Sequence, residues 1–242
     1  NALDRAVQQL QTDWYRRLQN KINNLPQDVQ IEFERQKQLY RLAQQQQWFL
    51  DDDLVNHLLD LNIEQNDVFN NEAAIEYITE HFDSYITTIT SANCYKTHKN
   101  IILQSSIAFS NQQYELAIFP LFAAFDNVIS RWYKGELSQQ YEYTNVFTRG
   151  LWNEMSQMNE VLETMNLNDN RESNKLLKGL NIIQAYLDLF TTYPENIAKL
   201  NRNSILHGSY NYSLLSATSY FKMVVLLQSA ISLEDIPFQS MP

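Results

Sequence analysis

Hydrophobic residues recur along most of the chain at spacings of three and four positions, which is the period of an amphipathic α-helix. The first clear stripe runs from Leu3 through Trp14 to Ile22, with polar and charged side chains on the other faces. Pro26 follows this stripe, and a proline cannot donate a hydrogen bond to the helical ladder. The pattern therefore predicts a first helix that ends just before Pro26.

Three more helices are predicted in the first 92 residues. One begins near Gln27 and ends at the glutamine run 44–47. A short one follows the three aspartates at 51–53, because acidic side chains favour helix N-termini. A long one follows Asn70 and Asn71, which are good N-caps.

The helical pattern breaks at residues 91–93, and we place a domain boundary there. We expect an N-terminal helical region over residues 1–92 and a helical bundle over 93–242. β-hairpin signals such as Asn-Gly are absent, so the sequence predicts an all-α fold. The helices expected after the boundary are 115–134 with a possible kink at Pro120, 147–165, 176–190, one from Pro194 to about Gly208, and 214–231.

Composition excludes several classes of protein. The chain has 242 residues, of which 44% are hydrophobic and 12% aromatic, so it can build a core and is not disordered. Cys94 is the one cysteine, which excludes disulfides and paired-cysteine zinc sites. Four glycines leave no material for glycine-rich phosphate loops.

The longest uninterrupted apolar run, 116–125, is far shorter than the roughly 20 residues of a membrane-spanning helix. We therefore expect no membrane association. With no cysteine pair, a reducing compartment is the simplest interpretation, and we expect a cytoplasmic protein.

Charge is distributed unevenly. The whole chain carries a net charge of −10, and residues 1–92 hold 7 basic and 15 acidic side chains. Residues 93–242 hold 11 basic and 13 acidic ones and are nearly balanced. An acidic protein is an unusual nucleic-acid binder, since phosphate contacts supply most non-specific affinity. The second region is at least compatible with a local basic patch.

One stretch combines residues that suit phosphate chemistry. Four residues separate Arg202 from His207, and Gly208 follows His207 in the chain. Cleavage of RNA by its own 2′-hydroxyl needs a group that moves protons and a cation that stabilises the phosphoryl oxygens. Imidazole and guanidinium supply these two functions without a metal ion. The spacing alone is also compatible with a surface arginine and a histidine that caps a helix end.

Five positions along a helix correspond to about 500°, so Arg202 and His207 point about 140° apart on a straight helix. They meet around one phosphate only if the helix unwinds near Gly208 or if a two-fold axis supplies a second copy.

The segment Leu200 to Gly208, followed by an aromatic last helix, resembles the HEPN superfamily, the higher-eukaryote and prokaryote nucleotide-binding helical domains. The signature of that family is Arg-x4–6-His, often with a polar residue after the arginine, here Asn203. The helix 115–134, with Asp126 inside its hydrophobic stripe, is similar to the first core helix of the family. The resemblance covers about residues 96–235.

The resemblance implies a dimeric, metal-independent endoribonuclease of phage defence or toxin–antitoxin systems, with two motifs facing one groove. Arg202 and His207 would be catalytic, Asn203 would assist, and Asp126 would orient Arg202. RNA would be the substrate, an antitoxin or another protein a possible partner, and no cofactor or metal is expected. Other family members are non-catalytic dimerisation, partner-binding or nucleotide-binding modules, and this alternative stays open.

Other candidate residues carry less weight. Tyr210 and Tyr212 are expected to contribute to nucleic-acid binding, because tyrosine rings can stack on unpaired bases. His98, beside Lys99, is expected on the surface. Glu76 and His81 lack the matched second helix that a metal site of this kind needs, and a solvated helix face is the simpler interpretation.

Overall fold

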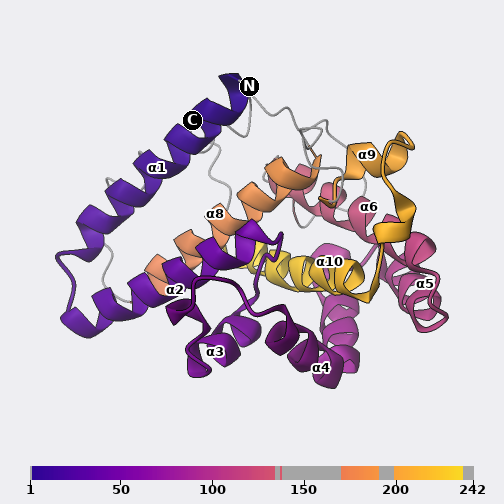
Figure 1. Ribbon diagram of the computed structural model, residues 1–242, viewed down its shortest axis with the longest axis horizontal. Coiled ribbons are helices and arrows are strands. Elements are labelled where there is room, and N and C mark those ends of the chain that lie inside the picture. Colours follow the sequence, from indigo (N-terminus) through magenta and orange to yellow (C-terminus); the bar gives the residue numbers. More distant parts are fainter. Residues whose placement is uncertain (1, 134–136, 138–169, 191–198, 237–242) are drawn as a thin grey trace.

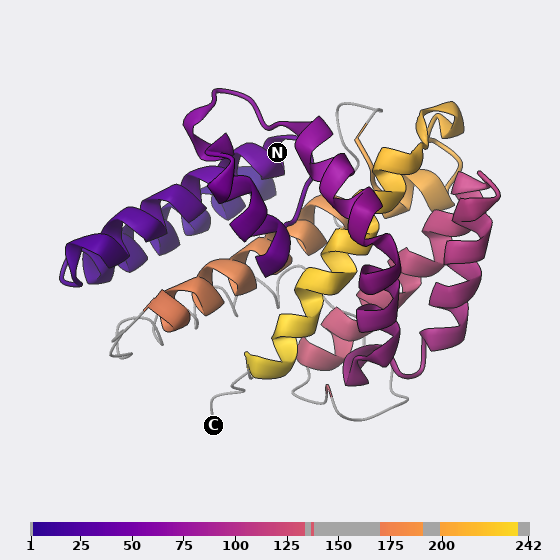
Figure 2. The same ribbon diagram turned by 90° about the horizontal axis from the view of Figure 1, so that it is seen from below.

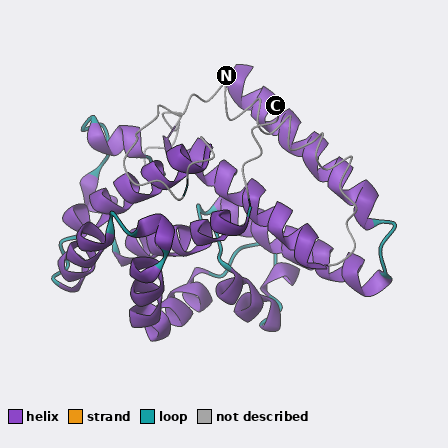
Figure 3. Cartoon of the chain, turned by 180° about the vertical axis from the view of Figure 1, so that it is seen from behind, coloured by secondary structure: helices purple, strands orange, loops and turns teal. Residues whose placement is uncertain are grey.

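The computed structural model describes residues 2–133, 137, 170–190 and 199–236. Helices and the turns between them make up this part of the chain (Figure 3), and it contains no strand. The predicted all-α fold is confirmed. Among the same residues, no helix combines the length and the apolar character that crossing a membrane requires.

The first two helices follow the predicted pattern. Helix α1 spans Ala2–Ile22, and α2 spans Gln27–Gln45 with Pro26 at its N-cap position. Leu18 and Ile22, at the end of the predicted stripe, are fully buried. Helix α1 lies at one edge of the molecule and contacts α2 (Figure 1).

Polar caps open the next two helices. Helix α3 spans Asp52–Asp60, and the side chain of Asp51 accepts hydrogen bonds from the first N–H groups of the helix. Helix α4 spans Asn71–Ser91 and is capped by Asn70 in the same manner. These side chains satisfy N–H groups that have no partner within the helix.

Helix α5, Lys99–Ser110, is an element that the hydrophobic stripes do not predict. Its apolar residues come in two short runs, 101–103 and 107–109, instead of one long stripe. Helix α5 packs against α6, Tyr114–Tyr133, which corresponds to the predicted helix 115–134 and contains Pro120.

The predicted helix 147–165 and the expected end of a helix at Gly135 lie outside the described residues. Helix α8, Asn170–Phe190, contains the predicted helix 176–190 and begins earlier. The chain is next described from residue 199.

The sequence pattern predicts a single helix from Pro194 to Gly208. For residues 199–201 this prediction is wrong, because they are not helical. Helix α9 is only Arg202–Leu206, and the backbone of Asn201 just before it is extended. Buried hydrogen bonds to Leu200, described below, hold the chain out of the helix at this point.

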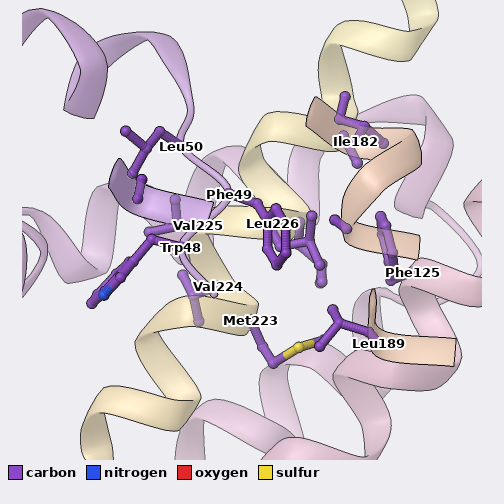
Figure 4. Packing of buried hydrophobic residues seen from close by; sticks show 14 of the residues in the cluster. Trp48, Phe49, Leu50, Phe125, Ile182, Leu189, Met223, Val224, Val225 and Leu226 are labelled. Carbon is purple, nitrogen blue, oxygen red and sulfur yellow. The ribbon is translucent and has the colours of Figure 1, made fainter. Parts of the chain in front are cut away.

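Helix α10, Ala217–Ala230, runs through the middle of the molecule in both views (Figures 1 and 2) and contacts α4, α6 and α8. Figure 4 shows Met223 to Leu226 of this helix beside Trp48 and Phe125. Buried residues from both sides of position 92 belong to one hydrophobic cluster. In the described residues, the regions 1–92 and 93–242 therefore share a core.

The remaining short elements are 3₁₀ turns. They are η1 (Ile63–Gln65), η2 (Asn93–Tyr95), η3 (Tyr212–Leu214) and η4 (Ile231–Asp235). Turn η2 falls at the place where the helical pattern of the sequence breaks, and it leads into α5.

Candidate functional site

A cavity of about 330 Å³ opens between the start of α5, the middle of α6 and helix α9. These elements lie on the same side of the molecule (Figure 1). The cavity is lined by His98, Phe119, Phe122, Ala123, Asp126, Asn127, Arg202 and Leu206. Arg202 and Asp126, which lie 76 positions apart in the sequence, thus face one space.

The position of Arg202 depends on the cap of helix α9. The side-chain oxygen of Asn201 accepts a hydrogen bond from the N–H of Ser204 at 3.1 Å. Its amide nitrogen donates to the carbonyl oxygen of Asp188 in α8 at 3.1 Å. Because Asn201 is fully buried, both bonds are shielded from water. The cap therefore fixes the first turn of α9, and with it Arg202, against α8.

Gln47 holds the preceding residue, Leu200, by both of its backbone polar groups. The amide nitrogen of Gln47 donates to the carbonyl oxygen of Leu200 at 2.9 Å. The side-chain oxygen of Gln47 accepts from the N–H of Leu200 at 2.7 Å. Both residues are buried. The N-terminal region thus contributes directly to the placement of the Arg202 segment.

Asp126 enters the cavity from α6 and is partly buried. Burial raises the pKa of its carboxyl group, while the hydrogen bond from Tyr186 and the charge of Arg202 act in the opposite direction. The hydroxyl of Tyr186 donates to Asp126 Oδ1 at 3.1 Å. Asp126 and Arg202 line the same cavity, and the orienting role expected for Asp126 stays a prediction.

His98 is a cavity residue that the sequence alone does not identify. It is half-buried, so its expected surface position is corrected by the structure. Its N–H donates to the carbonyl oxygen of Tyr95 at 2.8 Å, and its carbonyl accepts from Ile102 at 3.0 Å. The hydroxyl of the fully buried Tyr95 donates to Leu227 of α10 at 2.9 Å. The turn before α5 is therefore anchored to the core.

The imidazole of His98 is biased toward its neutral form. Burial lowers its pKa, and the positive charge of Arg131 lowers it further. Its Nδ1 lies 3.0 Å from the hydroxyl oxygen of Thr97. When Nδ1 donates to that oxygen, Nε2 carries the lone pair that accepts a proton. A histidine in this state suits the role of a general base.

Asn127 completes the polar side of the cavity, and Arg131 fixes its orientation. Arg131 Nε donates to Asn127 Oδ1 at 2.9 Å, and Arg131 Nη2 donates to the carbonyl oxygen of Cys94. With its oxygen engaged, the amide of Asn127 offers its NH₂ group as a donor. Arg131 is buried and adds a second positive charge next to Asn127.

His207 lies elsewhere on α9. It is exposed, it occupies the C-cap position, and its N–H donates to the carbonyl oxygen of Asn203 at 3.0 Å. It is not among the described residues that line the cavity, whereas Leu206 is. The structure therefore does not bring Arg202 and His207 together at this cavity within one chain, which agrees with their expected divergence of about 140° along a helix.

Gly208 ends α9 as the sequence predicts. Its φ of +72° is the left-handed conformation that favours glycine. The N–H groups of Gly208 and Ser209 donate to the carbonyl oxygens of Ile205 and Ser204, at 3.3 and 2.9 Å. This is the Schellman pattern of a helix C-terminus. The turn leaves His207 at the surface.

Asn203 is not among the described residues that line the cavity, but its side chain links Arg202 to α8. Its side-chain oxygen accepts from Arg202 Nη1 at 3.1 Å, and its amide nitrogen donates to the carbonyl oxygen of Phe190 at 2.7 Å. Asn203 thus contacts the guanidinium and ties it to α8, and its assisting role in catalysis stays a prediction.

The two tyrosines expected to bind nucleic acid are packed to different degrees. Tyr210 is only 5% exposed and meets Tyr212 edge to face, with ring centroids 6.3 Å apart. The hydroxyl of the half-buried Tyr212 donates to Ile205 at 2.6 Å. Because the Tyr210 ring is buried, it has little exposed surface on which a nucleobase could stack, and this corrects its expected role. The ring of Tyr212 is partly exposed.

The described residues contain no group of three His, Cys, Asp or Glu side chains that could hold a metal ion. His81 instead stacks on Tyr77 of the same helix, with ring centroids 4.2 Å apart, and His57 of α3 contacts the same tyrosine. These two histidines therefore belong to the contact between α3 and α4.

The fold and the site define an all-α protein in which side chains from three helical elements meet at one small, partly charged cavity. A scan of protein-family models, a search of curated proteins and a search of solved structures each found no match. The chemistry of the cavity is therefore the basis for a functional assignment.

Proposed function

We propose that the chain is a metal-independent endoribonuclease of HEPN type, with Arg202 as its phosphate-binding catalytic residue. The observation that carries this proposal is the meeting of Arg202 and Asp126 in one cavity. The Arg-x4-His resemblance implies this juxtaposition of an arginine on one helix and an acidic residue on another. Two residues that are 76 positions apart in the sequence need not otherwise lie in the same cavity.

The reaction is an internal transfer. The 2′-hydroxyl of a nucleotide loses its proton to a base and its oxygen forms a bond to the adjacent phosphorus. The bond from phosphorus to the 5′-oxygen breaks, and that oxygen gains a proton. Arg202 stabilises the negative charge that builds on the phosphoryl oxygens, which is worth several kcal/mol in a partly buried site. The products are a 2′,3′-cyclic phosphate and a 5′-hydroxyl.

A homodimer accounts for the exposed position of His207. Because this side chain lies at the surface beside the end of α9, a second copy related by a two-fold axis would bring two such motifs to one groove. By resemblance, the setting would be phage defence or toxin–antitoxin function in the cytoplasm, with an antitoxin as a further partner.

The alternative is a module that binds a nucleotide or a partner without cleaving RNA. The separation of His207 from the Arg202 cavity is the observation that favours it. In that case Arg202 would hold an anionic group, and the substitution of His207 would leave binding unchanged.

Cleavage of single-stranded RNA in the presence of a chelator tests the proposal. We expect Arg202→Ala and His207→Ala each to lower the rate by 100-fold or more, an order of magnitude typical of such groups. Arg41→Ala and His81→Ala, which change exposed residues away from the cavity, are matched controls and should cleave at the wild-type rate. Equal cleavage by Arg202→Ala and Arg41→Ala would overturn the proposal.

A further inference from the structure

We propose that the cavity between α5, α6 and α9 holds the ribose phosphate of one RNA nucleotide, with Arg202 as phosphate ligand and His98 as the base that takes the 2′-hydroxyl proton. This inference rests on the proposed function and deepens it, because it adds a catalytic residue outside the Arg-x4-His motif.

Geometry is the first support. His98 and Arg202 line the same cavity of one chain, although they lie 104 positions apart in the sequence. His207 is exposed on α9 and is not among the described residues that line this space. An imidazole and a guanidinium are therefore available to one ligand without a second copy of the chain.

The size and lining of the cavity fit the chosen ligand. A volume of about 330 Å³ lies at the lower end of the range for small-molecule sites. Phe119 and Phe122 provide an apolar wall against which a sugar or the edge of a base can pack. The NH₂ group of Asn127 adds a neutral donor for a phosphate or hydroxyl oxygen.

Arg202 is the charged lining residue that favours an anion beside His98. Arg202 lines the cavity and the buried Arg131 lies behind Asn127, while Asp126 is the acidic residue in the lining. Lys99, next to His98 in the chain, is exposed. Glu234 lies close enough to Arg131 for its charge to act on it, so the two arginines are matched by two carboxylates. Arg202 is therefore the cation that the cavity itself offers to a phosphate.

The proposed step balances in atoms and charge. His98 accepts the proton of the 2′-hydroxyl at Nε2, and the 2′-oxygen attacks phosphorus while Arg202 holds the phosphoryl oxygens. The bond to the 5′-oxygen breaks, and that oxygen takes a proton from the protonated His207 of a second copy, which the dimer of the proposed function supplies. A neutral imidazole is the required starting state for the base, and partial burial favours that state because it lowers the pKa of His98.

Proton NMR of the histidine rings tests the binding half of this inference. The chain has four histidines, so four C2–H signals are expected, and His98→Gln identifies one of them. Adding adenosine 3′-monophosphate should raise the pKa of His98 by about 1, because a bound phosphate stabilises imidazolium. His57 and His81 serve as internal controls, and Arg202→Ala should abolish the change while Arg41→Ala preserves it.

RNA cleavage tests the catalytic half. His98→Gln should lower the rate by about 100-fold and remove the acidic limb of the pH–rate profile, whereas His81→Gln should change neither. A His98 pKa that does not respond to the nucleotide would overturn the inference even if wild-type protein cleaves RNA. Wild-type rates in His98→Gln would overturn the base role and leave the proposed function standing. If wild type binds the nucleotide but cleaves no RNA, the proposed function and the base role both fail.

Discussion

Neighbouring side chains determine where Arg202 lies. Leu200 is held by Gln47, Asn201 caps the helix, and Asn203 ties the guanidinium to α8. Each of these bonds involves a buried or half-buried polar group, for which the loss of a partner is costly. The catalytic proposal therefore depends on residues that do no chemistry themselves.

Replacing Gln47 tests this dependence. Gln47→Ala leaves both backbone polar groups of Leu200 buried without their partners, and we expect a loss of about 2–3 kcal/mol in the free energy of unfolding. We also expect slower RNA cleavage, because the Arg202 segment loses its anchor. Urea unfolding and a cleavage assay measure the two effects.

Gln45→Ala is the matched control for this change. Gln45 is exposed at the end of α2, so its replacement should change the unfolding free energy by less than about 0.5 kcal/mol. If the two variants are equally stable, the hydrogen bonds between Gln47 and Leu200 do not anchor the segment.

At the scale of elements, α9 is the weakest part of the site, since a helix of five residues has little stability of its own. We expect Asn201→Ala to lower the free energy of unfolding by about 1–2 kcal/mol, because it removes both the N-cap and the bond to Asp188. Asn201→Ser keeps a capping oxygen and should recover about half of that loss. Chemical unfolding of the two variants and the wild type makes the comparison, and equal stability of Asn201→Ala and wild type would contradict it.

The element scale also shows what the sequence can predict. Helices α1 to α4, α6 and α10 follow from periodic stripes and polar caps, which are local signals. Helix α5 has no such stripe, so the sequence pattern does not predict this helix or the turn before it that carries His98. The start of α9 depends on Gln47, a residue 153 positions from Leu200, and no local pattern encodes a contact of that kind.

The same limit applies to the candidate site. Arg202 could be selected because it belongs to the Arg-x4-His motif. Asp126 could be selected because it is a charged residue within an apolar stripe. His98 could not, because its meeting with Arg202 depends on the packing of α5, α6 and α9. Tyr210 is of a residue type that can stack on bases, and its burial becomes visible only in the folded structure.

At the scale of the whole molecule, buried carboxyl groups should make stability fall as pH rises through the mildly acidic range. Burial raises the pKa of Asp188 to about 6, and burial likewise raises that of Asp51 to about 6, from a usual value of 3.8. A folded-state pKa above the unfolded one means that the stabilisation is complete below about pH 4 and is lost by about pH 6.

Asp188→Asn should remove its share of this dependence, on the order of 1–3 kcal/mol between those two pH values. Unfolding by urea at several pH values gives the slope, and Asp83→Asn, at an exposed carboxyl group, is the control. An unchanged slope in Asp188→Asn would show that this carboxyl group is not responsible.

The chemistry of the RNA ends tests the central claim most directly. Single-stranded RNA should be incubated with wild-type protein and with Arg202→Ala in excess chelator, and the products analysed by mass spectrometry. Transfer through the 2′-oxygen at the Arg202 cavity predicts wild-type products with 2′,3′-cyclic phosphate and 5′-hydroxyl ends, and none from Arg202→Ala. Intact RNA in the wild-type sample, products that end in 5′-phosphate, or the same cyclic ends from Arg202→Ala would contradict it.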